Sequence, residues 1–251
     1  MARMRRSIRS LWGIALVVSL LAPALPAAQA GGQDASGPGA SSPLRRSVTP
    51  AELQSDYERT TDWLAGWMRT RSPRPPVDPT QQSQTVAEWT VLVHIAADNN
   101  LELAGLSDLN EMEAVGSSPQ VNIVAQIDRS ADYVTLDGDW TETRRYYVQQ
   151  DDDPEAITSP VVFSPGELDS GSADTIADFA TWGIQTYPAK KYMLVLWDHG
   201  GGWTSHSSDE DSGSEVTLPD TVAALERIVA ETGIGQFEVV GFDMCLMGQL
   251  E

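Results

Sequence analysis

The chain has 251 residues and a formal net charge of −20, with 36 acidic residues against 16 basic ones. This acidic balance argues against nucleic acid or an anionic membrane surface as a partner, because both carry negative charge. The single cysteine excludes an internal disulfide, so its thiol is buried and inert, paired between chains, or a nucleophile.

Residues 1–30 have the three regions of a secretory signal peptide. Four Arg residues lie in the first ten positions, an apolar run follows over 11–25, and Ala-Gln-Ala at 28–30 offers a cleavage site. A membrane anchor is the alternative, but it needs about 20 apolar residues, and this run is shorter and contains Pro23. We therefore expect export to a secreted or periplasmic location, with no membrane association after cleavage. Removing the four Arg leaves 12 basic and 36 acidic residues, a net charge of −24.

Residues 31–87 are predicted to precede the globular domain. Gly, Ser, Ala and Pro are abundant in 31–47, which is typical of a flexible linker. Thr49-Pro50-Ala51-Glu52 forms a capping box with Pro at the first helical position, and apolar residues continue at helical spacing to Met68. This amphipathic helix is expected to pack on the domain surface. The alternative is a prosegment that covers the active site and restrains activity. Four prolines between 73 and 79 then interrupt regular structure.

From residue 88 to 251 predicted strands and helices alternate. Apolar, β-branched runs predict buried strands, and capping residues followed by helical spacing predict helices. The predicted strands cover 89–97, 121–127, 143–148, 192–197 and 237–242. The predicted helices cover 100–115, 172–187 and 217–233. This alternation predicts a three-layer α/β/α domain with a mainly parallel sheet.

Polar residues follow the predicted core strands, at the edge where such sheets carry their functional crevice. His199 and Cys245 each come just after a core strand, and the 46 residues between them suit one crossover connection. If their strands are neighbours, the strand axes lie about 4.8 Å apart and both side chains emerge at the same edge. Asp98-Asn99 and Asp128 follow the other two core strands.

A thiol next to an imidazole is the arrangement that nucleophilic catalysis requires. His199 would take the proton of Cys245 and later protonate the leaving amine. The glycines at 200–202 let the backbone approach a substrate closely. The N–H groups of Gly200 and Cys245 are candidates for an oxyanion hole.

Three segments resemble the clostripain family of cysteine peptidases, which has the caspase-like fold. They are 89–102 (WTVLVHIAADNNLE), 194–203 (LVLWDHGGGW) and 241–247 (GFDMCLM), in the order and spacing of that family. The resemblance covers residues 88–251 and implies that His199 is the base and Cys245 the nucleophile. It also implies that Asp243 lines an acidic S1 pocket that pairs with Arg or Lys of a polypeptide substrate. The expected function is an exported cysteine endopeptidase that cleaves after basic residues.

The chemistry of such a peptidase requires no cofactor, and the sequence contains no nucleotide or organic cofactor motif. Some relatives need calcium, and Asp209, Glu210 and Asp211 offer oxygen ligands, with a solvated acidic loop as the alternative. A zinc site built from His199 and His206 lacks a third and a fourth ligand. No residue is therefore assigned as a metal ligand.

The sequence stops at Glu251, six residues after Cys245, whereas relatives continue with further strands. The sequence is therefore either a fragment of a longer protein or a truncated chain, and a truncated chain would have an incomplete sheet with an exposed edge strand. A truncated chain favours one alternative function, a catalytically inactive binding module that kept the fold. A second alternative is an α/β-hydrolase esterase with a His-Gly-Gly-Gly motif, but the nucleophile elbow of that fold does not occur here.

The remaining polar and aromatic residues are interpreted structurally. His94 lies inside a strand and is expected in the core, whereas His206 is expected to be solvated in a polar loop. Asp98-Asn99 would shape the first strand–helix turn, and Asp198 is interpreted as structural rather than as a third catalytic residue. Trp89, Trp197 and Trp203 could line a substrate groove, although packing is the commoner use of such residues.

Overall fold

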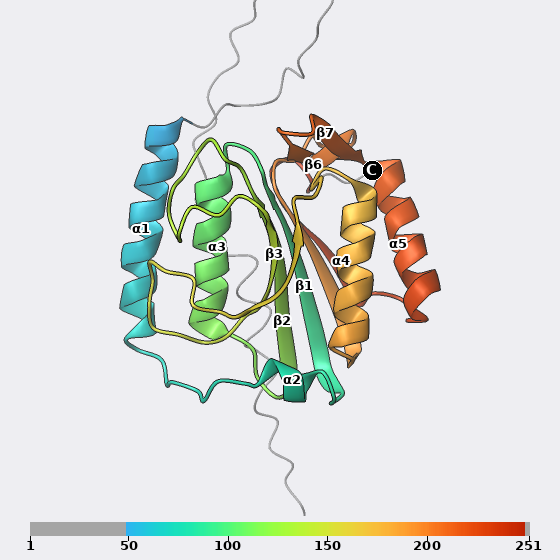
Figure 1. Cartoon of the computed structure of the whole chain (residues 1–251), viewed down its shortest axis with the longest axis horizontal. Helices are drawn as coiled ribbons and strands as arrows, with labels where there is room; N and C mark the ends of the chain where they lie inside the picture. The colour runs from blue at the N-terminus through green and yellow to red at the C-terminus, as the bar shows by residue number, and fades with distance from the viewer. Residues whose placement is uncertain (1–48, 249–251) are drawn as a thin grey trace, which may run out of the picture. The chain divides into compact units, whose positions relative to one another are not determined.

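The computed structural model describes residues 49–248, which form three layers (Figure 1). The predicted signal peptide at 1–30 and the linker at 31–47 lie outside the described residues. A six-stranded sheet forms the middle layer, with α3 on one face and α4 and α5 on the other (Figure 1). The predicted α/β fold with a mainly parallel sheet is confirmed.

The central sheet has the strand order β4-β3-β2-β1-β5-β8. Strands β1, β2, β5 and β8 are parallel, and β3 and β4 add antiparallel pairs at one side. The strands are β1 (Ala87–Ala97), β2 (Val121–Arg129), β3 (Thr143–Tyr147), β4 (Val161–Gly166), β5 (Ala189–Trp197) and β8 (Val239–Asp243). A separate antiparallel hairpin is formed by β6 (Ser205–Asp209) and β7 (Ser214–Thr217).

Three of the helices begin at capping residues that the sequence predicts. The helix bounds are α1 (Pro50–Met68), α2 (Pro79–Gln82), α3 (Glu102–Val115), α4 (Ala173–Thr186) and α5 (Leu218–Thr232). Thr49 and Glu52 form the capping box of α1, Ser172 accepts from the Asp174 N–H, and Thr217 accepts from the Asp220 N–H. These bonds satisfy N–H groups that have no partner within a helix.

Three short elements were not predicted, α2, β4 and the β6–β7 hairpin. Strand β6 consists of polar residues that are all buried, so it carries no apolar pattern. Strand β4 is an edge strand with exposed apolar side chains and Pro165, which weaken the alternation that marks a strand.

Buried polar side chains form a hydrogen-bonded row through the core on the α4 side of the sheet. His94 is fully buried; its Nε2 lies 3.1 Å from the Ser170 carbonyl oxygen, and its Nδ1 lies 3.2 Å from Gln126 Nε2. Arg145 Nε donates to Gln126 Oε1 at 2.7 Å. Burial lowers the pKa of His94 to about 4, so this ring is neutral at neutral pH. The prediction that His94 packs in the core is confirmed.

Helix α1 packs on the outside of α3 (Figure 1). Its buried residues Leu64 and Met68 contact Ala114, and the Arg71 guanidinium donates to the Ala114 carbonyl oxygen. These contacts lie at the carboxyl end of α3, away from the turn that joins β1 to α3. The expectation of surface packing is confirmed, and a restraint of activity by this helix stays a prediction.

Strand β8 is an edge of the sheet within residues 49–248. Val239 and Phe242 on this strand are 40% and 36% exposed.

The carboxyl group of Glu113 in α3 is buried and only half hydrogen-bonded. Its Oε1 accepts from the N–H groups of Thr158 (3.0 Å) and Ser159 (2.6 Å), whereas Oε2 has no partner. Burial raises its pKa to about 8. Since this pKa lies above the unfolded value of about 4.3, Glu113 contributes stability that is fully present below that value and is lost as pH rises towards 8.

We predict that Glu113→Gln becomes more stable relative to the wild type as pH rises from 6 to 9, because Gln keeps the acceptor and cannot ionise. Thermal unfolding at three pH values measures this difference. The exposed Glu226→Gln is the matched control and should show a constant difference. If the stability difference between Glu113→Gln and the wild type were also constant with pH, this would contradict the raised pKa of Glu113.

Candidate active site

His199 and Cys245 follow neighbouring parallel strands. The register pairs Met193 with Val239 and Trp197 with Asp243, so every partner in β8 lies 46 residues after its partner in β5. His199 and Cys245 are separated by the same 46 residues and come two positions beyond the last pair. The prediction that the two strands are neighbours is confirmed, and both residues leave the sheet at the same level.

The backbones after β5 and β8 lie against each other. A Cβ atom on Gly200 would come 2.0 Å from the Cys245 carbonyl oxygen and 2.9 Å from Met247 Cγ. Only a residue without a side chain fits this approach. Cys245 itself is exposed, and the next residue, Leu246, has φ +65°, a conformation uncommon for a residue other than glycine. The chain thus turns sharply just after an accessible thiol.

The imidazole of His199 is hydrogen-bonded to a residue that the sequence interpretation did not single out. Its Nε2 lies 3.0 Å from Asn100 Oδ1, in the turn between β1 and α3. The sequence did contain a signal for Asn100, because this residue follows the end of β1. Strand β5, which ends just before His199, lies between β1 and β8 in the sheet, so Asn100 and His199 are at the same edge.

Asp198 ties the end of β5 to the neighbouring segments. Its Oδ1 accepts from Asn99 Nδ2 at 2.9 Å, and its Oδ2 accepts from Ser208 Oγ at 3.1 Å and from the Ser208 N–H. Burial raises its pKa to about 7 despite these bonds. The carboxylate therefore holds β6 against the strand ends, which supports the structural interpretation of Asp198.

Asp98 and Asp128 are buried beyond the ends of β1 and β2. The Asp98 carbonyl oxygen accepts from the Glu210 N–H at 2.8 Å, whereas its carboxylate oxygens have no hydrogen-bond partner. Asp128 Oδ1 accepts from Thr143 Oγ1 at 2.6 Å. Burial raises the pKa of Asp98 to about 6 and that of Asp128 to about 8. Both residues shape this edge of the sheet.

Asp243 belongs to a group of three carboxylates on the α3 side of the sheet, which we call the α3–β8 carboxylate group (Asp108, Glu111 and Asp243). Burial and then the charges of Glu111 and Asp243 raise the pKa of Asp108 to about 8. Burial and then Asp243 raise the pKa of Glu111 to about 7, and partial desolvation also raises that of Asp243. Asp108 Oδ2 accepts from Trp197 Nε1 at 2.5 Å.

The sequence interpretation found only Asp243 of this group. The positions of Asp108 and Glu111, three residues apart on a predicted helix, place both carboxylates on one helical face, which was the signal for them. A group of carboxylates that raise one another's pKa values gains stability from a cation.

The loop carboxylates suggested for calcium are already hydrogen-bonded. Asp209 accepts from the N–H groups of Ser170 and Ser212, both at 2.8 Å, and Glu210 Oε2 accepts from the Tyr133 hydroxyl at 2.5 Å. Within residues 49–248 no three His, Cys, Asp or Glu side chains are grouped so that they could hold a metal ion. Calcium stays a prediction from the resemblance.

Two expectations were wrong. His206 is buried in β6, where its Nε2 lies 2.7 Å from Thr221 Oγ1 and its ring contacts Phe242. It was expected in a solvated loop because only polar residues surround it in the sequence. For Trp203, packing was the favoured use, but its side chain is 68% exposed, next to the glycines that follow His199, and its alternative role in a substrate groove stays a prediction.

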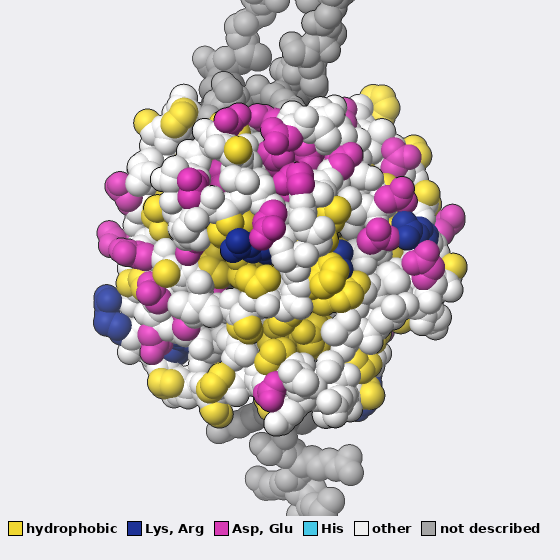
Figure 2. Space-filling model, viewed as in Figure 1, with side chains coloured by type: hydrophobic (Ala, Val, Ile, Leu, Met, Phe, Trp, Pro, Cys, Tyr) yellow, Lys and Arg dark blue, Asp and Glu magenta, His cyan; other side chains and the backbone are white. Residues whose placement is uncertain are grey.

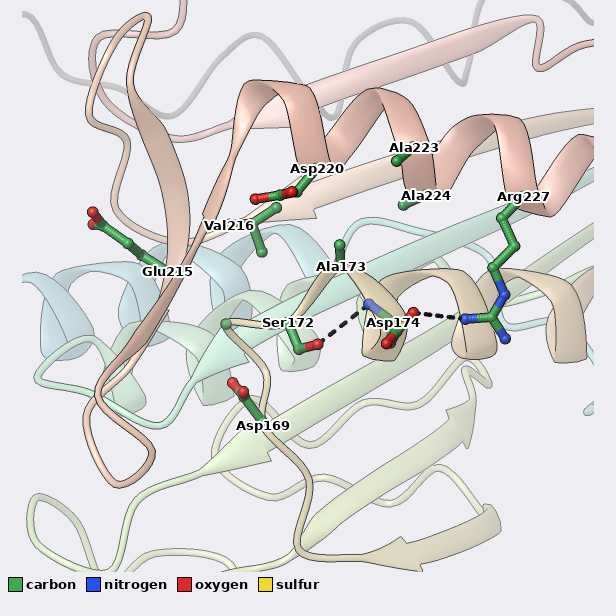
Figure 3. Close-up of a pocket in the computed structure, with 11 residues that line it drawn as sticks. Asp169, Ser172, Ala173, Asp174, Glu215, Val216, Asp220, Ala223, Ala224 and Arg227 are labelled. Carbon is green, nitrogen blue, oxygen red and sulfur yellow. Dashed lines mark hydrogen bonds and ion pairs between the residues drawn. The ribbon is translucent and has the colours of Figure 1, made fainter.

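A surface pocket of about 460 Å³ lies between the amino ends of α4 and α5 (Figure 3). Acidic side chains line it, and its Arg227 is paired with Asp174 at 3.0 Å. His199, Cys245 and Asp243 are not among its lining residues. The pocket is therefore separate from the candidate active site.

Gly200→Ala should disturb the contact between the two strand ends, because its methyl group would meet a backbone oxygen that cannot rotate away. We expect a destabilisation of about 1–3 kcal/mol and a changed alkylation rate of Cys245, the single thiol. Thermal unfolding and iodoacetamide labelling measure both effects. Gly235→Ala is the control, since its added methyl group would meet open space. Equal behaviour of the two variants would rule out the close approach.

The chain is similar to one family of cysteine proteases. Residues 93–251 match the model of the clostripain family, peptidase C11. Clostripain from Hathewaya histolytica is 26% identical over 190 residues, which cover 64% of this chain and 34% of that protein. The solved structure of a secreted C11 cysteine protease from Bacteroides thetaiotaomicron, in complex with an irreversible peptide inhibitor, is 25% identical. It matches with a TM-score of 0.50 over 64% of this chain and 43% of that chain.

An inactive zymogen C11 protease from Parabacteroides distasonis is 24% identical, with a TM-score of 0.45 over 64% of this chain and 43% of that chain. The present chain thus spans less than half the length of each of these three proteins.

Proposed function

This chain belongs to the clostripain family of cysteine peptidases, and on that premise we propose that it is an exported endopeptidase with Cys245 as nucleophile and His199 as base. One observation carries the proposal: the 46-residue offset of the β5–β8 register equals the separation of His199 and Cys245. Two unrelated polar residues would have no reason to share that offset. The contact between Gly200 and the Cys245 backbone supports the same juxtaposition.

The proposed reaction is a two-step acyl transfer. His199 takes the Sγ proton of Cys245, and the thiolate attacks the carbonyl carbon of the scissile peptide bond. The N–H groups of Gly200 and Cys245 stabilise the resulting oxyanion. The C–N bond then breaks, the imidazolium gives its proton to the leaving amine, and a thioester remains on Cys245. Water, deprotonated by His199, hydrolyses the thioester and restores the thiol.

The proposed specificity is for Arg or Lys on the amino side of the cleaved bond. Asp243 lies two residues before the nucleophile, and Asp108 and Glu111 add carboxylates beside it. A guanidinium or ammonium group placed there would offset the mutual repulsion of these carboxylates. Acidic side chains also gather at the upper edge of the face in Figure 2, where β1 and β2 end, which favours approach of a cationic substrate.

Export is proposed from the signal-peptide pattern of residues 1–30. The similar protease from Bacteroides thetaiotaomicron is described as secreted. None of the helices within residues 49–248 combines the length and the apolar character needed to cross a membrane.

Turnover of fluorogenic peptides tests the function. The purified chain should cleave after Arg or Lys and leave a matched Asp substrate intact. Cys245→Ala and His199→Ala should each reduce kcat/KM by at least about 100-fold, because nucleophile and base act as a unit. Turnover by Cys245→Ala equal to that of the wild type would reject the mechanism. A folded wild-type chain that binds basic peptides and never cleaves them would favour the inactive binding module.

Asp243→Asn tests the specificity separately. Loss of one charge-assisted contact should lower kcat/KM for an Arg substrate by about 10- to 100-fold. The alkylation rate of Cys245 should change little, because the nucleophile is retained. Asp211→Asn in the exposed acidic loop is the control and should leave kcat/KM unchanged within about twofold. A similar loss in both variants would point to the overall charge rather than to a pocket.

A further inference from the structure

We propose that Asn100 is a positioning residue for His199 and determines which ring nitrogen receives the thiol proton. The proposal rests on the proposed function, since it deepens the role of the same base. His199 Nε2 lies 3.0 Å from Asn100 Oδ1. A carboxamide oxygen only accepts hydrogen bonds, so Nε2 carries a proton and donates it. The lone pair of the neutral imidazole is then on Nδ1, which is the basic atom.

The turn that carries Asn100 is fixed by the preceding residue. The Asn99 side chain joins the ends of β1 and β5, strand β6 and the start of α3. Its Nδ2 donates to the Ala96 carbonyl oxygen (3.1 Å), Asp198 Oδ1 (2.9 Å) and the Ser208 carbonyl oxygen (3.0 Å), and its Oδ1 accepts from the Leu101 N–H (2.8 Å). Asn99 is fully buried, so these bonds are shielded from water. Asn100 is therefore held between a buried anchor and the first turn of α3.

The hydrogen bond gains strength during the reaction. When Nδ1 takes the proton of Cys245, the S–H bond breaks, an N–H bond forms, and the ring becomes an imidazolium. The Nε2–H group then donates as part of a cation, and such charge-assisted bonds are roughly twice as strong as neutral ones. Asn100 takes up no proton itself. It orients the ring and stabilises the charged form, the role that an Asn or Asp has in other nucleophile–His–acid arrangements.

The carboxylate next to His199 in the sequence is engaged elsewhere. Both oxygens of Asp198 accept hydrogen bonds from Asn99 and Ser208. The Asp198 carboxylate also accepts from the His199 backbone N–H, so its effect on the ring runs through the His199 backbone and through Asn99. The partner of the ring is an uncharged amide from a segment 99 residues earlier in the chain.

Nitrogen NMR of the imidazole rings in the full chain tests the proposal without any need for turnover. The chain has three histidines, so the His199 signals can be assigned with the variant His199→Gln. In the wild type, neutral His199 should be protonated at Nε2. Asn100→Ala should give a mixture of tautomers and a lower His199 pKa. Asn100→Asp should keep the Nε2–H tautomer and raise that pKa by about one unit or more, because it adds an opposite charge.

Kinetics with an Arg substrate provide the second readout. Asn100→Ala should lower kcat by about 10- to 100-fold with KM nearly unchanged, because the lost bond is strongest in the charged intermediate. The control is Asn122→Ala, which removes a buried hydrogen bond to Thr90 in the sheet. It should lower the melting temperature and leave the His199 tautomer and pKa as in the wild type.

The His199 pKa should fall in Asn100→Ala and rise in Asn100→Asp. A variant that was only destabilised would not shift this pKa in opposite directions, so the two shifts distinguish a positioning role from a role in folding. An Nδ1–H tautomer in the wild type, or the same His199 pKa in all three proteins, would overturn the proposal. If the NMR shifts are as expected but the wild type shows no turnover, the result would contradict the proposed function. The role of Asn100 in orienting the His199 ring would still hold.

Discussion

The parallel pairing of β5 with β8 is the constraint on which the candidate active site depends. Backbone hydrogen bonds fix this pairing, and a shift by one residue would move every side chain to the other face. The register with a constant offset of 46 residues brings the turns after the two strands to one level. Gly200 then allows the two backbones to touch. In the proposed mechanism, the thiol and the imidazole would therefore owe their proximity to the sheet.

A second set of contacts holds this edge of the sheet together. Asn99, Asp198 and Ser208 connect the ends of β1 and β5 to the β6–β7 hairpin through buried hydrogen bonds. Buried polar groups of this kind are costly when unpaired, so the ends of the strands keep one arrangement. The same arrangement presents Asn100 to the His199 ring.

Much of this could be predicted from the sequence because the core strands are long apolar runs and the helices carry strong caps. The rule that parallel strands present their carboxyl ends at one edge predicted that His199 and Cys245 lie at the same edge, and the strand order then showed that their strands are neighbours. The hairpin could not be predicted, since Ser205, Ser208 and Asp209 are polar residues that become buried only through tertiary hydrogen bonds. His206 was misplaced for the same reason. The strand end predicts the position of Asn100 and the helical spacing predicts the shared face of Asp108 and Glu111, but the sequence does not show which residues these side chains contact across about 90 residues or more.

The central claim is that the side chains at positions 199 and 245 meet, and a cross-linking experiment tests it most directly. His199→Cys gives the chain a second thiol besides Cys245, which is otherwise its only one. Neighbouring strand ends lie within the Cα separation of about 4.4–6.8 Å that a disulfide bridges. Mild oxidation should therefore produce an intramolecular disulfide, seen by mass spectrometry as the loss of both free thiols in the monomer, whereas the control Glu226→Cys should keep them. Two free thiols in oxidised His199→Cys monomer would contradict the account.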